Sequence, residues 1–363
     1  MWMILFMALP LLGSAYLSWH LWTLLPLHPL WRCLAIGLLV GSFLMLFLNF
    51  GRRFDALPMP LATACYEVST SSIFIMLYLV LLFLALDLGR LVRLVPRSWL
   101  YQNGWTAAAV FVLMVGLFVY GNIHYNNKVR VELDLPTPKQ LAKDYRIVML
   151  SDLHIGYHNP RSELARWVDI VNAEKPDFIL IAGDIIDGSM RPVVEERMAE
   201  EFRRLEAPVY ACLGNHEFYS GLPEARQFYR DAGIRLLIDE TAVIDSCITV
   251  IGRDDRTNMR RKPVRELVPS LRETFTIVLD HQPYNLDRTE LAGVDFQLSG
   301  HTHRGQVWPI SWITDRVYEC SWGSHQRGST RYYISSGIGI WGGKFRIGTQ
   351  SEYVVATLHS SFR

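Results

Sequence analysis

The sequence has few cysteines, and none of them forms a recognisable motif. The five positions show no CxxC pair and no zinc-ribbon spacing; they are Cys33, Cys65, Cys212, Cys247 and Cys320. An odd, scattered set of this kind argues against a disulfide framework and against a structural zinc site built on thiolates. We therefore expect free thiols that are buried or interfacial.

The chain also has no excess of charge of either sign. Its net charge is +1 and 20% of its 363 residues are charged. Because nucleic-acid binding relies on a strongly basic surface, nothing here predicts a nucleic-acid partner. Internal repeats and low-complexity tracts are missing as well. A chain of this length has room for about two domains.

Charged residues are scarce from Met1 to about Tyr125, where apolar runs dominate. A membrane-spanning helix needs about 20 mostly apolar residues. Four stretches qualify, near 1–22, 34–50, 70–90 and 105–122. The first has no basic n-region and three more follow it, which argues against a cleaved signal peptide. We expect residues 1–125 to form an all-α membrane domain of about four helices, or of three with one interfacial or re-entrant segment.

This domain predicts an integral membrane protein in contact with the lipid bilayer, and we expect a bacterial inner membrane. Tryptophans and tyrosines at the ends of the apolar stretches resemble an interfacial belt. Arginines occur on both expected sides of the membrane, so the positive-inside rule leaves the orientation open. Asp87, near the end of the third stretch, is expected to pair with Arg90 at i,i+3.

The remaining residues have the composition of a soluble globular domain. Residues 126–144 are expected to be a connector with a possible short strand at Val129–Leu133, and residues 145–363 a second domain. Up to about residue 234, apolar strand-like segments alternate with helical ones. This alternation predicts an α/β fold with at least a partly parallel sheet. Shorter strand-like segments follow and indicate a second, mixed sheet.

Five polar motifs in this domain each follow a predicted strand. They are Ser151-Asp152-Leu153-His154, Gly183-Asp184-Ile185-Ile186-Asp187, Gly214-Asn215-His216-Glu217, Asp280-His281-Gln282-Pro283 and Gly300-His301-Thr302-His303. Ligands of open α/β sheets bind at the carboxyl ends of the strands. We therefore expect the five motifs to converge on one edge of the fold.

The residue types of these motifs suit divalent metals. Carboxylate, amide and imidazole ligands fit Mn²⁺, Fe or Zn²⁺. Two such ions side by side can activate a water and bind phosphate oxygens, which predicts hydrolysis of a phosphate ester. Asp152 and His154 are two residues apart, and on an extended segment they would share one face. Gly183 would let the chain turn sharply before Asp184.

With these motifs, the second domain resembles the calcineurin-like metallophosphoesterase superfamily, in the subgroup with N-terminal membrane helices. The resemblance covers about residues 145 to 358. It implies two mixed β-sheets sandwiched by helices. It also implies one metal held by Asp152, His154, Asp184 and His303, and a second held by Asp184, Asn215, His281 and His301.

His216 stands beside a ligand but is not one in this scheme. We expect it to give a proton to the leaving-group oxygen. The resemblance implies that Asp187 orients His216, although Asp187 could instead cap the following helix. Glu217 is expected to support its loop.

Two features depart from many relatives. A glycine often stands where Arg304 follows His303, so Arg304 is either a contact for substrate phosphate or a solvated loop charge. Relatives often carry an arginine near the segment Ser335–Gly339, which has none here.

The leading hypothesis is a membrane-anchored phosphoesterase that uses two metals to hydrolyse a phosphodiester or pyrophosphate. The anchor favours a lipid-linked substrate, by analogy with a relative that cleaves the pyrophosphate of a UDP-linked diacylated sugar. The alternative is a non-catalytic membrane scaffold or sensor on the same fold, which should have lost a ligand or the proton donor. A transporter is disfavoured because the apolar stretches contain few charges.

Overall fold

The computed structural model describes residues 2–269 and 273–361, with side chains from residue 10 onward. The chain forms two compact units. The helical unit comprises Met1–Asn122 and Gly342–Lys344, and the sheet unit comprises Ile123–Trp341 and Phe345–Arg363.

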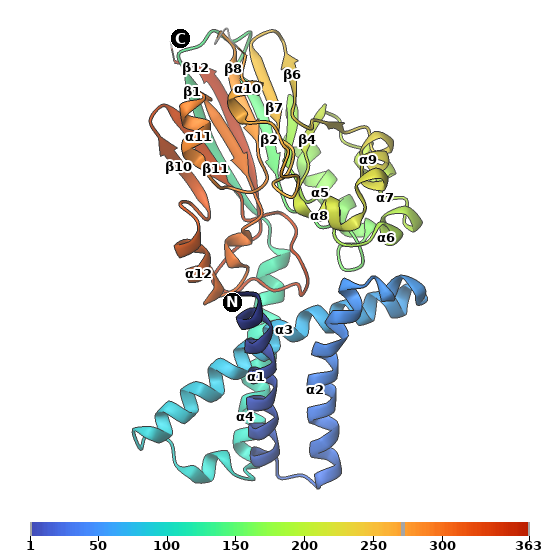
Figure 1. Ribbon diagram of the computed structural model, residues 1–363, viewed down its shortest axis with the longest axis vertical. Coiled ribbons are helices and arrows are strands. Elements are labelled where there is room, and N and C mark those ends of the chain that lie inside the picture. The colour runs from blue at the N-terminus through green and yellow to red at the C-terminus, as the bar shows by residue number, and fades with distance from the viewer. Residues whose placement is uncertain (1, 270–272, 362–363) are drawn as a thin grey trace. The chain divides into compact units, whose positions relative to one another are not determined.

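The helical unit consists of long helices (Figure 1). They are α1 (Trp2–Leu24), α2 (Pro29–Phe50), α3 (Met59–Leu91) and α4 (Gly104–Asn126), with the short 3-10 helices η1 (Arg53–Ala56) and η2 (Arg97–Leu100). α1 packs against α2 and α3. Within the described part of the chain, α2, α3 and α4 are long and apolar enough to cross a membrane. The fourth predicted span, residues 1–22, lies partly outside the residues whose side chains are described.

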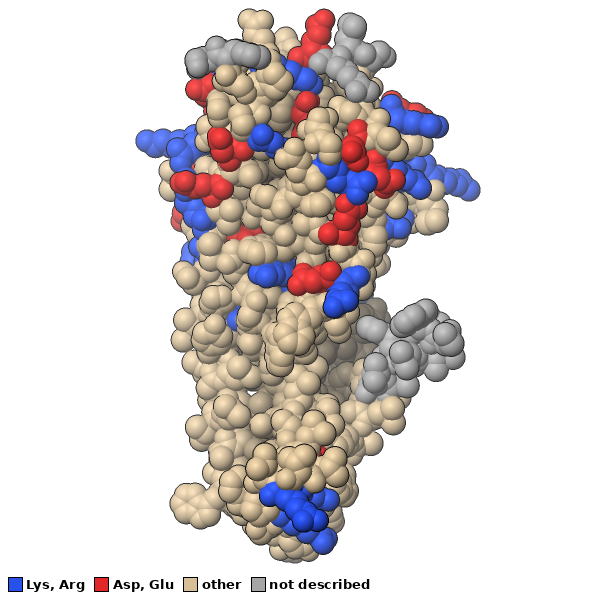
Figure 2. All heavy atoms as spheres, turned by 90° about the vertical axis from the view of Figure 1, so that its left-hand side faces the viewer, with Lys and Arg blue, Asp and Glu red and all other residues tan. Residues whose placement is uncertain are grey.

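The surface of the helical unit is strongly apolar. Leu38, Trp105 and Phe111 are 74%, 89% and 69% exposed. Figure 2 shows the charged side chains of this face gathered mainly over the sheet unit, whereas the helices are largely uncharged apart from one basic cluster. Apolar side chains that face outward along whole helices are stable in lipid and costly in water. The structure thus supports the predicted membrane association.

The carboxylate of Asp87 is paired differently from the sequence prediction. Its Oδ2 atom accepts a hydrogen bond from the Tyr16 hydroxyl at 2.7 Å and lies 3.0 Å from His20 Nε2. Both partners lie on α1, whereas Asp87 lies on α3. Asp87 therefore has partners on a neighbouring helix in place of Arg90. Hydrogen bonds between packed helices satisfy polar side chains that lie in apolar surroundings.

Two six-stranded mixed sheets form the sheet unit. The strands of the first, in spatial order, are β1 (Val129–Thr137), β12 (Glu352–Ser360), β2 (Tyr145–Leu150), β3 (Phe178–Ala182), β4 (Val209–Cys212) and β5 (Arg235–Leu236). Those of the second are β10 (Gly323–Arg327), β11 (Thr330–Ile334), β9 (Phe296–Ser299), β8 (Phe275–Leu279), β7 (Ile248–Gly252) and β6 (Glu240–Ile244).

Helices cover the outer faces of the two sheets or lie beyond the ends of their strands (Figure 1). They are α5 (Arg161–Ala173), α6 (Met190–Glu195), α7 (Met198–Phe202), α8 (Asn215–Ser220), α9 (Leu222–Asp231), α10 (Val264–Leu267), α11 (Leu286–Leu291) and α12 (Ile310–Val317), with the 3-10 helix η3 (His303–Gly305). The predicted sandwich of two mixed sheets between helices is confirmed.

Alternating side chains of the central strands build two separate cores. In β2, Ile147 and Met149 pack between the two sheets, whereas Val148 and Leu150 pack under the helices. Successive residues of a strand point to opposite faces, so a strand covered on both sides must be apolar throughout. This explains the continuous apolar runs before the motifs, and it makes the sheets a rigid base for the loops at their ends.

The sequence patterns did not predict every helix and strand boundary correctly. One helical segment expected in the alternating part is broken into α6 and α7, because Arg197 between them takes a left-handed conformation with φ 55°. The segment 126–144 supplies β1, an edge strand that pairs in parallel with β12 along its whole length. Strand β10 has the polar sequence Gly-Ser-His-Gln-Arg and gives no apolar signal.

Candidate metal centre

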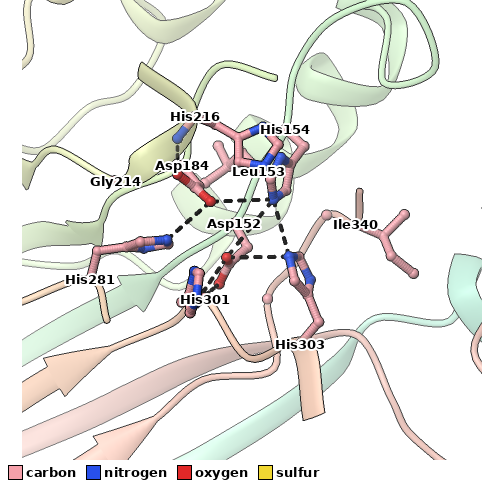
Figure 3. A network of polar contacts seen from close by, with 12 residues as sticks. Asp152, Leu153, His154, Asp184, Gly214, His216, His281, His301, His303 and Ile340 are labelled. Carbon is pink, nitrogen blue, oxygen red and sulfur yellow. Dashed lines mark hydrogen bonds and ion pairs between the residues drawn. The ribbon is translucent and has the colours of Figure 1, made fainter. Parts of the chain in front are cut away.

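Six of the seven predicted ligands lie together where strands of both sheets end (Figure 3); they are Asp152, His154, Asp184, His281, His301 and His303. In the first sheet, Asp152 and His154 follow β2 and Asp184 follows β3, and these two strands are parallel neighbours. In the second sheet, His281 follows β8 and His301 follows β9, which are again parallel neighbours. Parallel neighbours end at the same edge, so the two sheets bring motifs that are far apart in sequence to one place.

The ligand loops have an unusual backbone. Five of the seven predicted ligands have positive φ angles; they are Asp152 (54°), His154 (46°), Asp184 (51°), His301 (70°) and His303 (47°). Side chains other than glycine rarely adopt this left-handed region, and such residues gather at functional sites where the surroundings hold them. The prediction that Asp152 and His154 lie on an extended segment is therefore wrong. Both residues have a left-handed backbone conformation, and in this conformation their side chains reach the site.

One predicted ligand set is compact. The Nε2 atoms of His154 and His303 are 3.1 Å apart, and His303 Nε2 lies 3.4 Å from Asp152 Oδ1. Ligand atoms of Asp152, His154 and His303 all lie within 4.8 Å of one another. Asp152 and His154 are fully buried. The backbone N–H of His301 donates to both carboxylate oxygens of Asp152, at 3.0 and 3.1 Å.

The second set forms around His281. Its Nδ1 atom lies 2.7 Å from the carbonyl oxygen of Ala182, and its Nε2 atom lies 3.0 Å from Asp184 Oδ2. Ligand atoms of Asp184, His281 and His301 also lie within 4.8 Å of one another. A histidine that donates one ring N–H to a backbone carbonyl holds its other nitrogen ready as a ligand. Asn215 is the first residue of α8, and its side chain is buried.

The residues fit a pair of divalent cations. Among the residues that the structure describes, Asn215 Oδ1 is buried with no hydrogen-bond partner. Buried polar atoms normally have a partner, so a cation would satisfy this oxygen. Burial opposes ionisation of Asp184, but His281 and His216 nearby hold the pKa of that carboxyl well below its usual range. The donors are oxygen and nitrogen atoms, as Mn²⁺, Fe and Zn²⁺ accept.

Glu217 supports two of the ligand loops, as expected from the sequence. Its buried carboxylate accepts hydrogen bonds from the backbone N–H groups of Gly214 at 2.7 Å, Asp184 at 3.2 Å, Ile185 at 2.8 Å and Ile186 at 3.0 Å. One side chain therefore ties the loop after β3 to the loop after β4.

His216 and Asp187 lie together beside the ligands. The Nδ1 atom of His216 is 3.4 Å from Asp187 Oδ1, and His154 Nδ1 is 3.3 Å from the same oxygen. Burial raises the pKa of Asp187, but the rings of His154 and His216 beside it hold that pKa well below its usual range. The following helix, α6, is capped by Ser189, which accepts from the Arg191 N–H. Ser189, and not Asp187, therefore occupies the N-cap position of this helix.

Arg304 lies at the rim of the centre, next to His303. Its guanidinium carbon is 4.0 Å from the centre of the Trp322 ring. An arginine stacked on an indole keeps its charge and its N–H groups at the edge of the guanidinium. The position agrees with either role expected from the sequence.

Sequence reasoning missed two supporting residues, Arg346 and Asn159. Arg346 is fully buried, and its guanidinium donates to the carbonyl oxygens of His303 at 2.7 Å and of Ser336. It thus reaches the segment where relatives often carry an arginine. Asn159 is also fully buried and donates to backbone carbonyls of the Asp152–His154 turn. A lone arginine or asparagine in a loop gives no local signal of such contacts.

Comparison with known proteins agrees with this geometry. The model of the calcineurin-like phosphoesterase family matches residues 145–305, which include all seven predicted ligands. A metallophosphoesterase of Aquifex aeolicus is 30% identical over 63% of this chain and 92% of its own length. One of Campylobacter jejuni is 30% identical over 69% of this chain and 68% of its own.

An animal relative extends the similarity toward the membrane part. The protein of Danio rerio described as a transmembrane protein with metallophosphoesterase domain is 27% identical over 76% of this chain and 70% of its own length. Together with the apolar helices before the sheet unit, these matches identify the chain as a member of the calcineurin-like phosphoesterase family with N-terminal membrane helices.

Proposed function

We propose that the protein is a membrane-anchored phosphoesterase that uses two divalent metals to hydrolyse a phosphodiester or pyrophosphate of a lipid-linked substrate. We further propose the inner membrane of a bacterium as its location, in keeping with its bacterial relatives.

The position of Asp184 carries the proposal. Its Oδ2 atom lies 3.0 Å from His281 Nε2 of one ligand set and 3.7 Å from His154 Nε2 of the other. A carboxylate that lies between two sets of oxygen and nitrogen donors is suited to bridge two cations. Asp152, His154, Asp184 and His303 would hold one cation, and Asp184, Asn215, His281 and His301 the other. When bound, two such ions lower the pKa of a water and polarise the phosphate oxygens.

The protein supplies the remaining chemistry through His216. Its Nδ1 atom faces Asp187, which leaves Nε2 to give a proton to the leaving-group oxygen. The ionised Asp187 stabilises the protonated ring and fixes its orientation. With 15% of its side chain exposed, His216 is more accessible than the fully buried His154 beside it. A leaving group can therefore approach His216 from the solvent side.

The rival function is a non-catalytic scaffold or sensor. Such a protein gains nothing from a complete set of ligands and a proton donor, and loss of at least one of them is expected. Here the sequence contains all seven proposed ligands and His216, and six of the ligands lie together with His216 (Figure 3). This favours catalysis.

The lipid-linked substrate is supported by the chain connection. Helix α4 ends at Asn126 and β1 begins at Val129. Only two residues therefore separate a helix apolar enough to span the bilayer from the first strand of the sheet unit. A short tether favours substrates that are themselves held in the membrane.

The test is an activity screen of the full chain in detergent with added Mn²⁺. We expect hydrolysis of an aryl phosphodiester and of lipid-linked pyrophosphates, with aryl phosphomonoesters as the comparison. Asp184→Ala should abolish it while the protein still folds. Full activity in Asp184→Ala would refute the metal mechanism, and hydrolysis of soluble substrates alone would refute the lipid-linked class.

A further inference from the structure

The last turn of helix α4 belongs to the sheet unit. The boundary between the units falls after Asn122, and Tyr125 in this last turn is fully buried. Lys128 lies 3.4 Å over the centre of the Tyr125 ring and holds it by a cation–π contact. The end of an apolar helix is thus fixed within the unit that contains the candidate metal centre.

The Tyr125 hydroxyl faces two buried acceptors. It lies 3.0 Å from Asn159 Oδ1 and 2.6 Å from Glu163 Oε1. Glu163 is 2% exposed and Asn159 is fully buried. The single hydroxyl proton is shared between these oxygens, so removal of the hydroxyl takes a donor from both in a place that water does not reach.

Asn159 connects Tyr125 to the backbone of His154, a proposed metal ligand. Its Nδ2 atom donates to the carbonyl oxygens of Leu153 and His154, each at 3.0 Å. The same nitrogen lies 3.3 Å from the carbonyl oxygen of Ile340 and from His158 Nε2, so its two hydrogens have four acceptors within reach, the two nearest of them in this turn. The Oδ1 atom is then the acceptor that faces Tyr125. The orientation of the amide therefore depends on the tyrosine hydroxyl.

The turn needs such support. His154 has φ 46°, a conformation that a histidine adopts at a cost and keeps only when its surroundings hold it. The His154 ring lies 3.1 Å from that of His303, in the set that would hold one cation. A small rotation of the His154 backbone would move its Nε2 atom out of this set.

We propose that Tyr125 and Asn159 are positioning residues, through which the end of helix α4 fixes the backbone of His154 for metal binding. This inference rests on the proposed function, because it concerns one of the proposed metal ligands. Residues that orient metal ligands typically change metal affinity about 10–100-fold when they are replaced. Tyr125 and Asn159 act in series, so their effects should not add.

The experiment measures Mn²⁺ binding to the full chain in detergent, by electron paramagnetic resonance of the free ion. For Tyr125→Phe we expect one of two Mn²⁺ ions to bind about tenfold more weakly and the other to bind unchanged. Asn159→Ala should have the same effect, and the double variant should be no weaker than the stronger single one. Tyr120→Phe is the matched control, because this tyrosine lies on the same helix and is 52% exposed.

The outcomes separate the two proposals. If the unmodified chain binds no Mn²⁺ pair, the proposed function fails. If it binds two ions and Tyr125→Phe binds them equally well, only the positioning role is overturned. Equal weakening at both ions with a lower melting temperature would show general packing and also overturn it. Should Tyr125→Phe fail to fold, Asn159→Asp decides, since it keeps the shape and Oδ1 but removes both amide donors.

Discussion

Arg346 holds the backbone of His303 from a position 43 residues further along the chain. Its Nη1 atom donates to the His303 carbonyl oxygen at 2.7 Å, and its Nε atom donates to the Ser351 hydroxyl at 3.1 Å. Burial lowers the pKa of Arg346 to about 10, so it stays charged at neutral pH. A buried charged group that donates hydrogen bonds to loop carbonyl oxygens fixes the conformation of those loops.

Arg346→Met should therefore destabilise the protein. Methionine fills much of the same space, but it removes the Arg346 donor from the carbonyl oxygens of Ser336 and His303, and His303 then keeps only the N–H of Gln306. The expected loss is about 2–4 kcal/mol, which lowers the melting temperature by about 5–15 °C. The measurement is thermal unfolding of the full chain in detergent. The control is Arg316→Met on α12, an exposed position, and equal melting temperatures for both variants would contradict the assigned role.

His216→Ala should separate catalysis from metal binding. Because His216 is expected to transfer a proton, kcat for an aryl phosphodiester should fall about 10²–10⁴-fold. The number of bound Mn²⁺ ions should stay at two, since His216 is not among the proposed ligands. His325→Ala, outside the motifs, serves as the control with unchanged kcat. Loss of a metal ion in His216→Ala would instead make this histidine a ligand.

Gly300→Ala should disrupt the centre through crowding. A Cβ atom at Gly300 would collide with Asp152 Oδ2 and approach Ser151 Oγ to 2.8 Å. Asp152 would have to shift from its present position in the ligand set, and one Mn²⁺ should be lost together with most of the activity. Gly188→Ala is the control, because a Cβ atom there meets nothing within 4 Å. The idea fails if both variants bind two ions and turn over substrate equally.

Metal affinity should rise with pH. Burial lowers the pKa of His154, but Asp152 and Asp187 outweigh it and raise that pKa to about 10, while Asp184 raises that of His281. At pH 7 the metal-free rings therefore carry protons that a metal must displace. Because the metal-free state binds more protons, raising the pH favours the metal-bound state. Mn²⁺ titrations at pH 6, 7 and 8 check this, and a constant affinity would contradict it.

Much of the fold could be predicted because its signals are local. Five-residue apolar runs such as Phe178–Ala182 are strands in the structure with the same bounds. A strand buried on both faces must be apolar at every position, so its sequence alone reveals it. Strand β10 could not be found in this way, because it lies at the edge of its sheet and its polar side chains are partly exposed.

The contacts that support the site could not be predicted, because they join residues that are far apart in the sequence. Asn159 contacts Tyr125, 34 residues away, and Arg346 contacts His303 across 43 residues. Neither residue type forms a pattern with its sequence neighbours. The partner of Asp87 was missed in the same way, because the i,i+3 rule concerns one helix and the structure uses two.

The sequence by itself determined which side chains follow each strand, and therefore which chemistry the chain can perform. That information is local, because a motif and the apolar run before it are adjacent in the chain. Only the tertiary structure decided that Asp152 receives the N–H of His301, 149 residues away, and that Asp184 lies between His154 and His281. Such contacts arise when the two sheets pack through their shared apolar core, an interaction that no single segment contains.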